Sequence, residues 1–408
     1  MTQADEARIA NGGLEVIDTP EAFARGVARI AEGEGPVAVD AERASGYRYS
    51  DRAYLVQLYR RGAGTLLIDP LPIGSLAALG EAIHDEEWVF HAATQDLPCL
   101  REIDLDPATI FDTELGARLL GMERVGLGAV VEELLGITLA KAHSADDWSV
   151  RPLPTSWLAY AALDVELLVD VRDLMAQRLV DQGKDGLARQ EFDDILVREL
   201  GAKRSEPWRR MNGYSKLRTP RAQAIARELW LARDAYARET DNAPGRIVPD
   251  RALTAAAAAM PSSRGALQGL KEFTGRESRS QLDRWWAAIE AGRSTTDLPS
   301  RRGERPAIPP HRSWAHRAPD ADARLRAGRA AVERVAETLG MPVENVLTPD
   351  YLRRVAWEPP TTIDTATIAA ALAASGARPW QVDAVSELVA RAFVEVGQPP
   401  AHADETAS

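Results

Sequence analysis

The segment 37–42, VAVDAE, combines an apolar run with two carboxylates, and this limits how the chain around it can fold. Its valines and its alternating pattern predict a β-strand. Side chains two residues apart on a strand point to the same side, so Asp40 and Glu42 would lie together on one face. Like charges side by side on a buried strand repel each other. We therefore expect a positively charged ligand at this face.

Strand-like and helix-like runs alternate from residue 14 to residue 170, which predicts a mixed α/β sheet with crossover helices. From Leu100 onward nearly every segment has a helical pattern. The expected strands lie at 14–19, 37–42, 54–60, 64–70 and 88–93, and the expected helices at 20–32, 75–85, 112–121 and 127–136.

The 408 residues exceed the size at which a single hydrophobic core stops growing, so two or three domains are expected. Charge, glycine and proline interrupt the helical pattern at 201–207, and a Pro, Arg and Ser-rich stretch follows a second helical block. The predicted organisation is an α/β domain at 1–200, an all-α domain at 206–292, a linker at 293–312, a second all-α domain at 313–396 and a loose tail at 397–408.

The two helical blocks resemble each other. Residues 246–261 align with residues 345–360, and the Pro-Asp pair at 249 recurs 100 residues later at 349. Each segment follows a long helix rich in Ala, Arg and Leu. Chance similarity between alanine-rich helices is the alternative, but duplication is the simpler explanation.

Composition restricts the chemistry. Cys99 is the only cysteine, which excludes internal disulfides and cysteine-rich zinc sites and fits a reducing compartment. No segment has eighteen uninterrupted apolar residues, and the first ten residues lack a signal-peptide pattern, so we expect a cytoplasmic protein without a membrane partner.

The net charge is −12, yet residues 200–320 contain 23 Lys and Arg against 13 Asp and Glu. This basic region indicates either a phosphate-binding surface or a solvated Arg-rich face.

Two more acids stand out. Asp96 follows the strand-like run at 88–93, and Asp164 lies in a helical segment with Tyr160 four residues earlier on the same helical face. Four converging carboxylates without clustered Cys or His suit Mg²⁺ or Mn²⁺. Two such ions about 4 Å apart activate a water and stabilise the leaving oxygen of a phosphodiester.

Each of these residues also has a structural interpretation. Asp40 and Glu42 could lie at a solvated strand end, Asp96 could cap the helix that begins near Pro98, and Tyr160 could be an interfacial core residue. Likewise Asp112 is expected to cap its helix rather than to bind metal.

The order of the motifs favours the functional interpretation. VAVDAE at 37–42, HAATQDLPCL at 91–100 and YAALD at 160–164 resemble the three motifs of DEDD-superfamily exonucleases, in the subclass whose third motif begins with tyrosine. The surrounding sequence resembles ribonuclease D. Residues 206–292 resemble the helicase and RNase D C-terminal (HRDC) domain, and residues 313–396 resemble a divergent second copy.

This resemblance implies a ribonuclease-H-like α/β core that removes nucleotides from RNA 3′ ends and releases nucleoside 5′-monophosphates. Carried over by motif, it implies two Mg²⁺ or Mn²⁺ ions held by Asp40, Glu42, Asp96 and Asp164, with Tyr160 orienting the attacking water. We expect RNA with a free 3′ end as the substrate, such as tRNA precursors. Candidate substrate-binding residues are His91, Gln95, Arg151, Arg209, Arg210, Lys216 and Arg218.

Two alternatives stay open at this point. A DNA 3′–5′ exonuclease would use the same metal site, because the two sugars differ only at the 2′-hydroxyl. A catalytically silent nucleic-acid-binding protein is disfavoured, because an inactive site gains nothing from retaining adjacent buried charges. The sequence contains no GxxxxGK[ST] phosphate loop, so no ATP-driven motor is expected.

Overall fold

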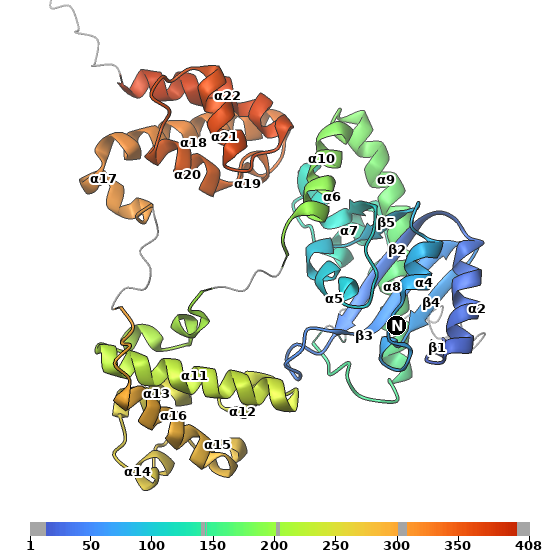
Figure 1. The fold of residues 1–408 in the computed structure, drawn as a ribbon. Helices are drawn as coiled ribbons and strands as arrows, with labels where there is room; N and C mark the ends of the chain where they lie inside the picture. The colour runs from blue at the N-terminus through green and yellow to red at the C-terminus, as the bar shows by residue number, and fades with distance from the viewer. Residues whose placement is uncertain (1–13, 140–142, 144, 201–204, 301–307, 398–408) are drawn as a thin grey trace, which may run out of the picture.

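The structure is a computed structural model, and it describes residues 14–139, 143, 145–200, 205–300 and 308–397. Figure 1 shows three lobes: an α/β lobe followed by two helical ones. The two all-α segments expected from the sequence are both present. The predicted boundary at 201–207, the linker at 293–312 and the tail at 397–408 each fall partly outside the described residues. Among the described residues, no helix is both long and apolar enough to cross a membrane.

The α/β lobe is built on a six-stranded mixed sheet in the order β1-β4-β3-β2-β5-β6. The β2 strand pairs antiparallel with β3 and parallel with β5, which places it near the middle of the sheet. The strands are β1 (Val16–Ile17), β2 (Glu34–Arg43), β3 (Ala53–Arg61), β4 (Gly64–Ile68), β5 (Glu87–Phe90) and β6 (Thr109–Asp112).

The sixth strand corrects the expectation that everything after Leu100 is helical. The β6 strand pairs parallel with β5, from Thr109 opposite Glu87 to Asp112 opposite Phe90. Only four residues long, it leads directly into α6, so it offers too few residues for a period-two pattern to be recognised.

Helices cover this sheet. The α2 helix begins after Thr19, whose side chain accepts a hydrogen bond from the Ala22 N–H, and Pro20 occupies its first position. The helices of this lobe are α2 (Pro20–Ala31), α3 (Pro70–Ile73), α4 (Ala77–Ala82), α5 (Leu97–Arg101), α6 (Thr113–Leu119), α7 (Leu127–Leu135), α8 (Thr155–Glu166), α9 (Leu168–Asp181) and α10 (Asp185–Val197), with the 3₁₀ turn η1 (Ala93–Gln95).

The two helical lobes repeat one order of elements. Each contains a long helix, then a four-residue helix, then a helix whose first residue belongs to the Pro-Asp pair. The first has η2 (Pro207–Arg210), η3 (Tyr214–Lys216), α11 (Pro220–Thr240), α12 (Pro244–Ile247), α13 (Asp250–Ala259), α14 (Arg264–Gln268), α15 (Arg276–Ser280) and α16 (Leu282–Ser294). The second has η4 (His311–Ser313), α17 (Trp314–Arg317), α18 (Pro319–Leu339), α19 (Val343–Val346), α20 (Pro349–Trp357), α21 (Thr365–Ala374) and α22 (Pro379–Gly397).

The second helical lobe shares a core with the α/β lobe. One continuous cluster of buried apolar residues includes members of both, whereas the first helical lobe has a separate cluster. At this junction the guanidinium of Arg378, the residue directly before α22, donates to both Glu191 carboxylate oxygens at 2.7 and 2.8 Å. The Trp380 indole N–H donates to the same carboxylate at 2.7 Å, so this contact fixes the second helical lobe to α10.

Candidate active site

The β2 strand and the α8 helix bring three carboxylates together. Asp40 and Glu42 project from the same face of β2, and α8 packs across β2, β3 and β4. Carboxylate oxygens of Asp40, Glu42 and Asp164 all lie within 4.8 Å of one another. The side chains are half-buried rather than fully solvated, so the solvated strand end considered from the sequence is not what the structure shows.

Asp96 stands beside this group rather than inside it. It lies between η1 and α5, after the neighbouring parallel strand β5, and its side chain is buried. Its carboxylate forms an ion pair with Arg43 at 3.6 Å and makes no capping hydrogen bond to the helix that follows. The capping interpretation of Asp96 is therefore wrong. Its negative charge and that of Asp40 each raise the pKa of Glu42, which places all these acids in one electrostatic environment.

Burial and mutual repulsion dominate the electrostatics of the site. Loss of solvation, followed by the charges of Asp40, Asp164 and Asp96, raises the pKa of Glu42 to about 9. Burial and the charge of Asp40 raise the pKa of Asp164 to about 8. A group of acids that resists ionisation in this way is stabilised by a bound cation.

Tyr160 lies one turn before Asp164 on α8 and donates its hydroxyl hydrogen bond to that carboxylate. Burial, together with the charges of Asp164 and Glu42, raises the pKa of the phenol above its ordinary value. The hydroxyl therefore remains protonated at neutral pH. It can orient a neighbouring oxygen, but it is not a base.

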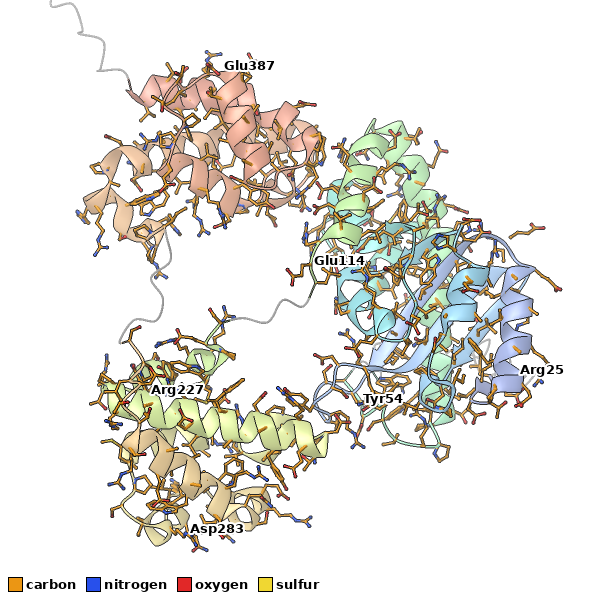
Figure 2. All side chains as sticks on the ribbon, in the orientation of Figure 1. Arg25, Tyr54, Glu114, Arg227, Asp283 and Glu387 are labelled. Atoms are coloured by element: carbon orange, nitrogen blue, oxygen red, sulfur yellow. The ribbon has the colours of Figure 1, made fainter. Side chains whose placement is uncertain are left out.

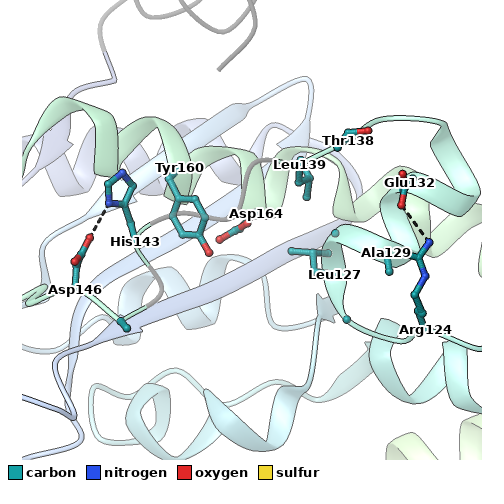
Figure 3. A pocket seen from close by; sticks show the side chains of 13 residues that line it. Arg124, Leu127, Ala129, Glu132, Thr138, Leu139, His143, Asp146, Tyr160 and Asp164 are labelled. Atoms are coloured by element: carbon teal, nitrogen blue, oxygen red, sulfur yellow. Dashed lines mark hydrogen bonds and ion pairs between the residues drawn. The ribbon is translucent and has the colours of Figure 1, made fainter.

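A cavity of about 870 Å³ opens beside Tyr160 and Asp164. Figure 3 shows both side chains along its wall, together with the imidazole of His143, whose Nδ1 lies 2.7 Å from an Asp146 carboxylate oxygen. The His143 ring stands edge-on to Tyr160, with 5.8 Å between ring centroids. At the far end, Arg124 pairs with Glu132 at 3.2 Å. The cavity thus has an acidic end next to the carboxylates and a mixed apolar and charged wall beyond it.

Asp112 organises the loop that carries Asp96. Its carboxylate accepts hydrogen bonds from the N–H groups of Glu114 and Leu115, which confirms the expected helix cap on α6. It also accepts from the N–H groups of Ala92 and Ala93 at 3.1 and 2.9 Å. The single buried carboxylate therefore fixes the start of α6 against η1.

The predicted substrate-binding residues fall into two groups. Three of them, His91, Arg151 and Arg209, contact other residues of the protein. The His91 Nδ1 lies 2.9 Å from the Thr113 hydroxyl, and burial lowers its pKa to about 4, so the ring is neutral. Arg151 donates to Asp69 at 2.5 Å and to the carbonyls of Trp148, Val150 and Tyr54, which makes it a brace.

Arg209 also bonds internally, to Glu206 and the Tyr214 hydroxyl, and stacks 4.3 Å over the Trp208 ring. The remaining four are exposed and offer side chains to a ligand: Gln95, Arg210, Lys216 and Arg218.

Two residues of the site, Arg43 and Gln57, were not expected from the sequence. Arg43 directly follows the acidic pair, and its positive charge partly offsets the rise that burial causes in the pKa values of Asp40, Glu42 and Asp96. Gln57 lies opposite Asp40 in the β2–β3 ladder and is fully buried, and within the described residues neither of its amide atoms has a hydrogen-bond partner. The only signal for Gln57 was a polar residue in the middle of an apolar strand.

Three family models match separate parts of the chain. A 3′–5′ exonuclease model matches residues 14–180, an HRDC model matches residues 222–289, and a model described as the 3′ to 5′ exonuclease C-terminal domain matches residues 307–393. These matches follow the three lobes in order.

Named relatives decide the family. Ribonuclease D of Gluconacetobacter diazotrophicus is 32% identical over 65% of this chain and 69% of its own length. Ribonuclease D of Acidiphilium cryptum is 31% identical over 78% of this chain and 79% of its own length. The chain belongs to the ribonuclease D family. It is a 3′–5′ exoribonuclease with an HRDC domain.

Solved structures agree with the architecture. A protein from Bifidobacterium adolescentis is 37% identical, with a TM-score of 0.85 over 93% of this chain and 97% of that one. Escherichia coli RNase D, at 24% identity, has a TM-score of 0.66 over 88% of this chain and 97% of its own and shares the fold. The ribonuclease-H-like nuclease domain with a mixed sheet, the HRDC domain and the helical C-terminal region are therefore those of the family.

Proposed function

We propose that this ribonuclease D-family protein hydrolyses the last phosphodiester at a free RNA 3′ end by a two-metal mechanism and releases nucleoside 5′-monophosphates. The observation that carries the proposal is the approach of Asp40, Glu42 and Asp164 to within 4.8 Å beside Tyr160. Structured RNAs such as tRNA precursors are the proposed substrates.

The residues present fit divalent cations. The donor set consists of half-buried carboxylates without clustered His or Cys, which suits Mg²⁺ or Mn²⁺. Asp40, Glu42 and Asp164 would hold the ions, and Asp96 would complete the set from the loop after β5. When bound, such ions activate the attacking water and stabilise negative charge on the scissile phosphate. Without them the carboxylates would repel the same phosphate.

The chain's own residues account for the remaining requirements. The Tyr160 hydroxyl, anchored on Asp164, orients the attacking water at the end of the cavity. The cavity beside it has room for a terminal nucleotide, and its volume of about 870 Å³ falls in the range of small-molecule sites. Arg43 holds Asp96 beside the acidic pair.

Exposed basic side chains on the HRDC domain supply a path for the rest of the RNA. Arg210, Lys216 and Arg218 are exposed near the start of this domain and would contact backbone phosphates. These contacts carry no sequence information, which suits an enzyme that trims the ends of different RNAs.

Asp40→Asn tests the chemistry against binding. Asn keeps the side-chain volume but removes the charge that a cation needs, so 3′ trimming should stop while RNA binding persists. Asp170→Asn is the matched control, because Asp170 is an exposed acid in the first turn of α9 that pairs with Arg61 and does not belong to the acidic group. Persistent trimming by Asp40→Asn would contradict the proposal.

Substrate chemistry is tested with matched RNA and DNA oligonucleotides and with RNA whose 3′ hydroxyl is blocked. We expect cleavage of the RNA with a free 3′ end, mononucleotide products with a 5′ phosphate, and loss of activity in chelator. Equal cleavage of DNA would favour the alternative of a general 3′–5′ exonuclease, and products longer than one nucleotide would rule out stepwise trimming.

A further inference from the structure

The loop at 44–52 joins β2 to β3 and comes directly after the strand that carries Asp40 and Glu42. In Figure 1 the C-terminal end of α11 and the short α12 helix of the HRDC domain lie next to the nuclease lobe at this loop. Side chains and backbone atoms of the two lobes contact each other here, so the loop is held from outside the nuclease domain.

Asp241, the residue directly after α11, provides the first contact. Its Oδ1 accepts the Ser50 N–H at 3.0 Å, and its Oδ2 lies 3.4 Å from the Tyr54 hydroxyl, which donates to it. Burial opposes ionisation of this carboxylate, but the hydrogen bonds from Ser50 and the charges of Arg52 and Arg48 bring its pKa below the ordinary value. One ionised group thus spans the end of the loop and the start of β3.

Arg246, on α12, provides the second contact. Its Nε donates to the Gly46 carbonyl at 2.9 Å, and its guanidinium stacks 3.9 Å over the Tyr47 ring. Beside it, the Ala243 N–H donates to the Tyr47 carbonyl at 3.0 Å. Backbone, cation–π and charge-assisted contacts therefore converge on the first half of the loop.

Tyr49 provides a third contact at the centre of the loop. Its hydroxyl donates to Asp234 at 3.0 Å and accepts from Arg238 at 3.2 Å, both on α11. On the nuclease side, the Arg48 Nε donates to the Ser149 hydroxyl at 2.8 Å. The loop is thus held between the HRDC domain and the segment that precedes α8.

The same loop forms one wall of a small pocket next to the acids. This pocket, of about 180 Å³, is lined by Glu42, Arg43, Ser45 and Gly46, with Ala41, Ala145 and Asp146. Gly46, whose carbonyl Arg246 holds, is only four residues from Glu42. A shift of the loop would therefore move the pocket wall and the end of β2 that carries Glu42 and Arg43.

We propose that the HRDC domain is a positioning element of the nuclease site: Asp241 and Arg246 fix the 44–52 loop and thereby set the position of Glu42 and Arg43, independently of any contact between the HRDC domain and RNA. This inference rests on the proposed role of Glu42 in hydrolysis. It treats Asp241 and Arg246 as positioning residues, because neither reaches the acidic group itself.

A short substrate separates positioning from RNA binding. A dinucleotide has one phosphodiester, which must sit among the carboxylates to be cut, so no backbone phosphate is left for the basic residues of the HRDC domain. The experiment measures kcat and KM with RNAs of two to six nucleotides, and compares variants on the shortest one that the wild-type chain cuts and on a long RNA.

Asp241→Gly is the cleanest variant. Asp241 has a positive φ of 47°, which glycine adopts without strain, so the change removes the carboxylate without disturbing the backbone. Arg246→Ala removes the second contact, and Arg246→Lys retains a donor for the Gly46 carbonyl. The matched control is the double variant Lys216→Ala, Arg218→Ala, which removes exposed charge near the start of the same domain, whereas the contacts to this loop come from the C-terminal half of α11, from Asp241 and from α12.

We expect Asp241→Gly and Arg246→Ala to lower kcat on the shortest substrate about tenfold with little change in KM, because small displacements of catalytic groups have effects of this order or larger. Arg246→Lys should recover part of the rate. Hydrogen exchange in the 44–52 loop should quicken while the far strands β1 and β4 stay protected, which shows that the chain remains folded. The control should raise KM for the long RNA only.

Unchanged kcat on the shortest substrate in both contact variants, or unchanged exchange in the loop, would overturn the inference. Failure of the proposed function is a different result: Asp40→Asn would then retain activity, whatever the HRDC variants do.

Discussion

At the scale of single residues, the acidic group consists of carboxylates whose ionisation is disfavoured by their surroundings in the protein. Asp40, Glu42 and Asp164 lie within 4.8 Å of one another in a half-buried position, where desolvation and repulsion both disfavour their charges. A cation removes both costs at once. The metal-free protein should therefore be less stable than its neutralised variants.

Asp40→Asn separates the effect of this charge on stability from its role in RNA trimming. The variant should lose trimming, yet the chelated protein should unfold about 3 °C higher than wild type, because removing one buried like charge stabilises a domain of this size by about 1 kcal/mol. Thermal unfolding in chelator, and again with Mn²⁺, checks this. Mn²⁺ should stabilise wild type more than the variant, and a lower melting temperature for the variant in chelator would contradict the account.

Tyr160→Phe tests whether the phenol orients the water. Phe keeps the ring next to His143 but lacks the hydroxyl that donates to Asp164. We expect kcat to fall about 100-fold, with little change in KM and in Mn²⁺ affinity, since the carboxylates remain. A normal kcat would assign Tyr160 to packing alone.

The sequence predicted the acids but not all of their neighbours. Asp40 and Glu42 are two apart on one strand, and Tyr160 and Asp164 are four apart on one helix, so local periodicity alone places each pair. The buried position of Gln57 opposite Asp40 depends on strand register. The brace formed by Arg151 depends on Asp69, 82 residues away. Neither partner can be read from spacing.

At the scale of elements, the loop after β5 depends on a neighbouring helix. Asp112 caps α6 and also accepts hydrogen bonds from Ala92 and Ala93, in the loop that leads to Asp96. Because β6 was not expected from the sequence, the cap was predicted without its second role. Both roles follow from the parallel pairing of β5 with β6, which places the two strand ends together.

Asp112→Ala should therefore cost more than an ordinary cap. It leaves buried backbone N–H groups without acceptors, and we expect a loss of about 3 kcal/mol of unfolding free energy together with weaker trimming. Thr19→Ala is the matched control, because it removes an exposed cap on α2 and should cost about 1 kcal/mol with normal activity. Denaturant unfolding of both variants checks this, and equal costs would count against the second role.

At the scale of the whole molecule, the nuclease lobe is held at two places. The HRDC domain contacts the loop after β2. The second helical lobe is fixed to α10 through Arg378 and Glu191, whose side chains are 9% and 6% exposed. In Figure 2 the side chains of the second helical lobe lie next to those of α10. The order of the lobes was predictable from composition breaks, but an ion pair between residues 187 positions apart was not.

Arg378→Met tests this second junction. It leaves the Glu191 carboxylate buried, with the Trp380 indole as its one remaining donor among the described residues, and we expect the free energy of unfolding to fall by about 3 to 5 kcal/mol. Adding Glu191→Gln should recover part of that loss, because the unpaired charge is then gone. Thermal unfolding of the single and double variants measures both effects, and a double variant less stable than the single one would contradict the explanation.

The most direct test of the whole account is to locate the cations. Crystals of the protein with Mn²⁺ and a nucleoside 5′-monophosphate, measured at the manganese absorption edge, would reveal each ion by its anomalous signal. We predict two ions bound by Asp40, Glu42, Asp96 and Asp164. The nucleotide phosphate should lie between these two ions and the Tyr160 hydroxyl. Ions bound elsewhere, or none at these carboxylates at millimolar Mn²⁺, would contradict the account.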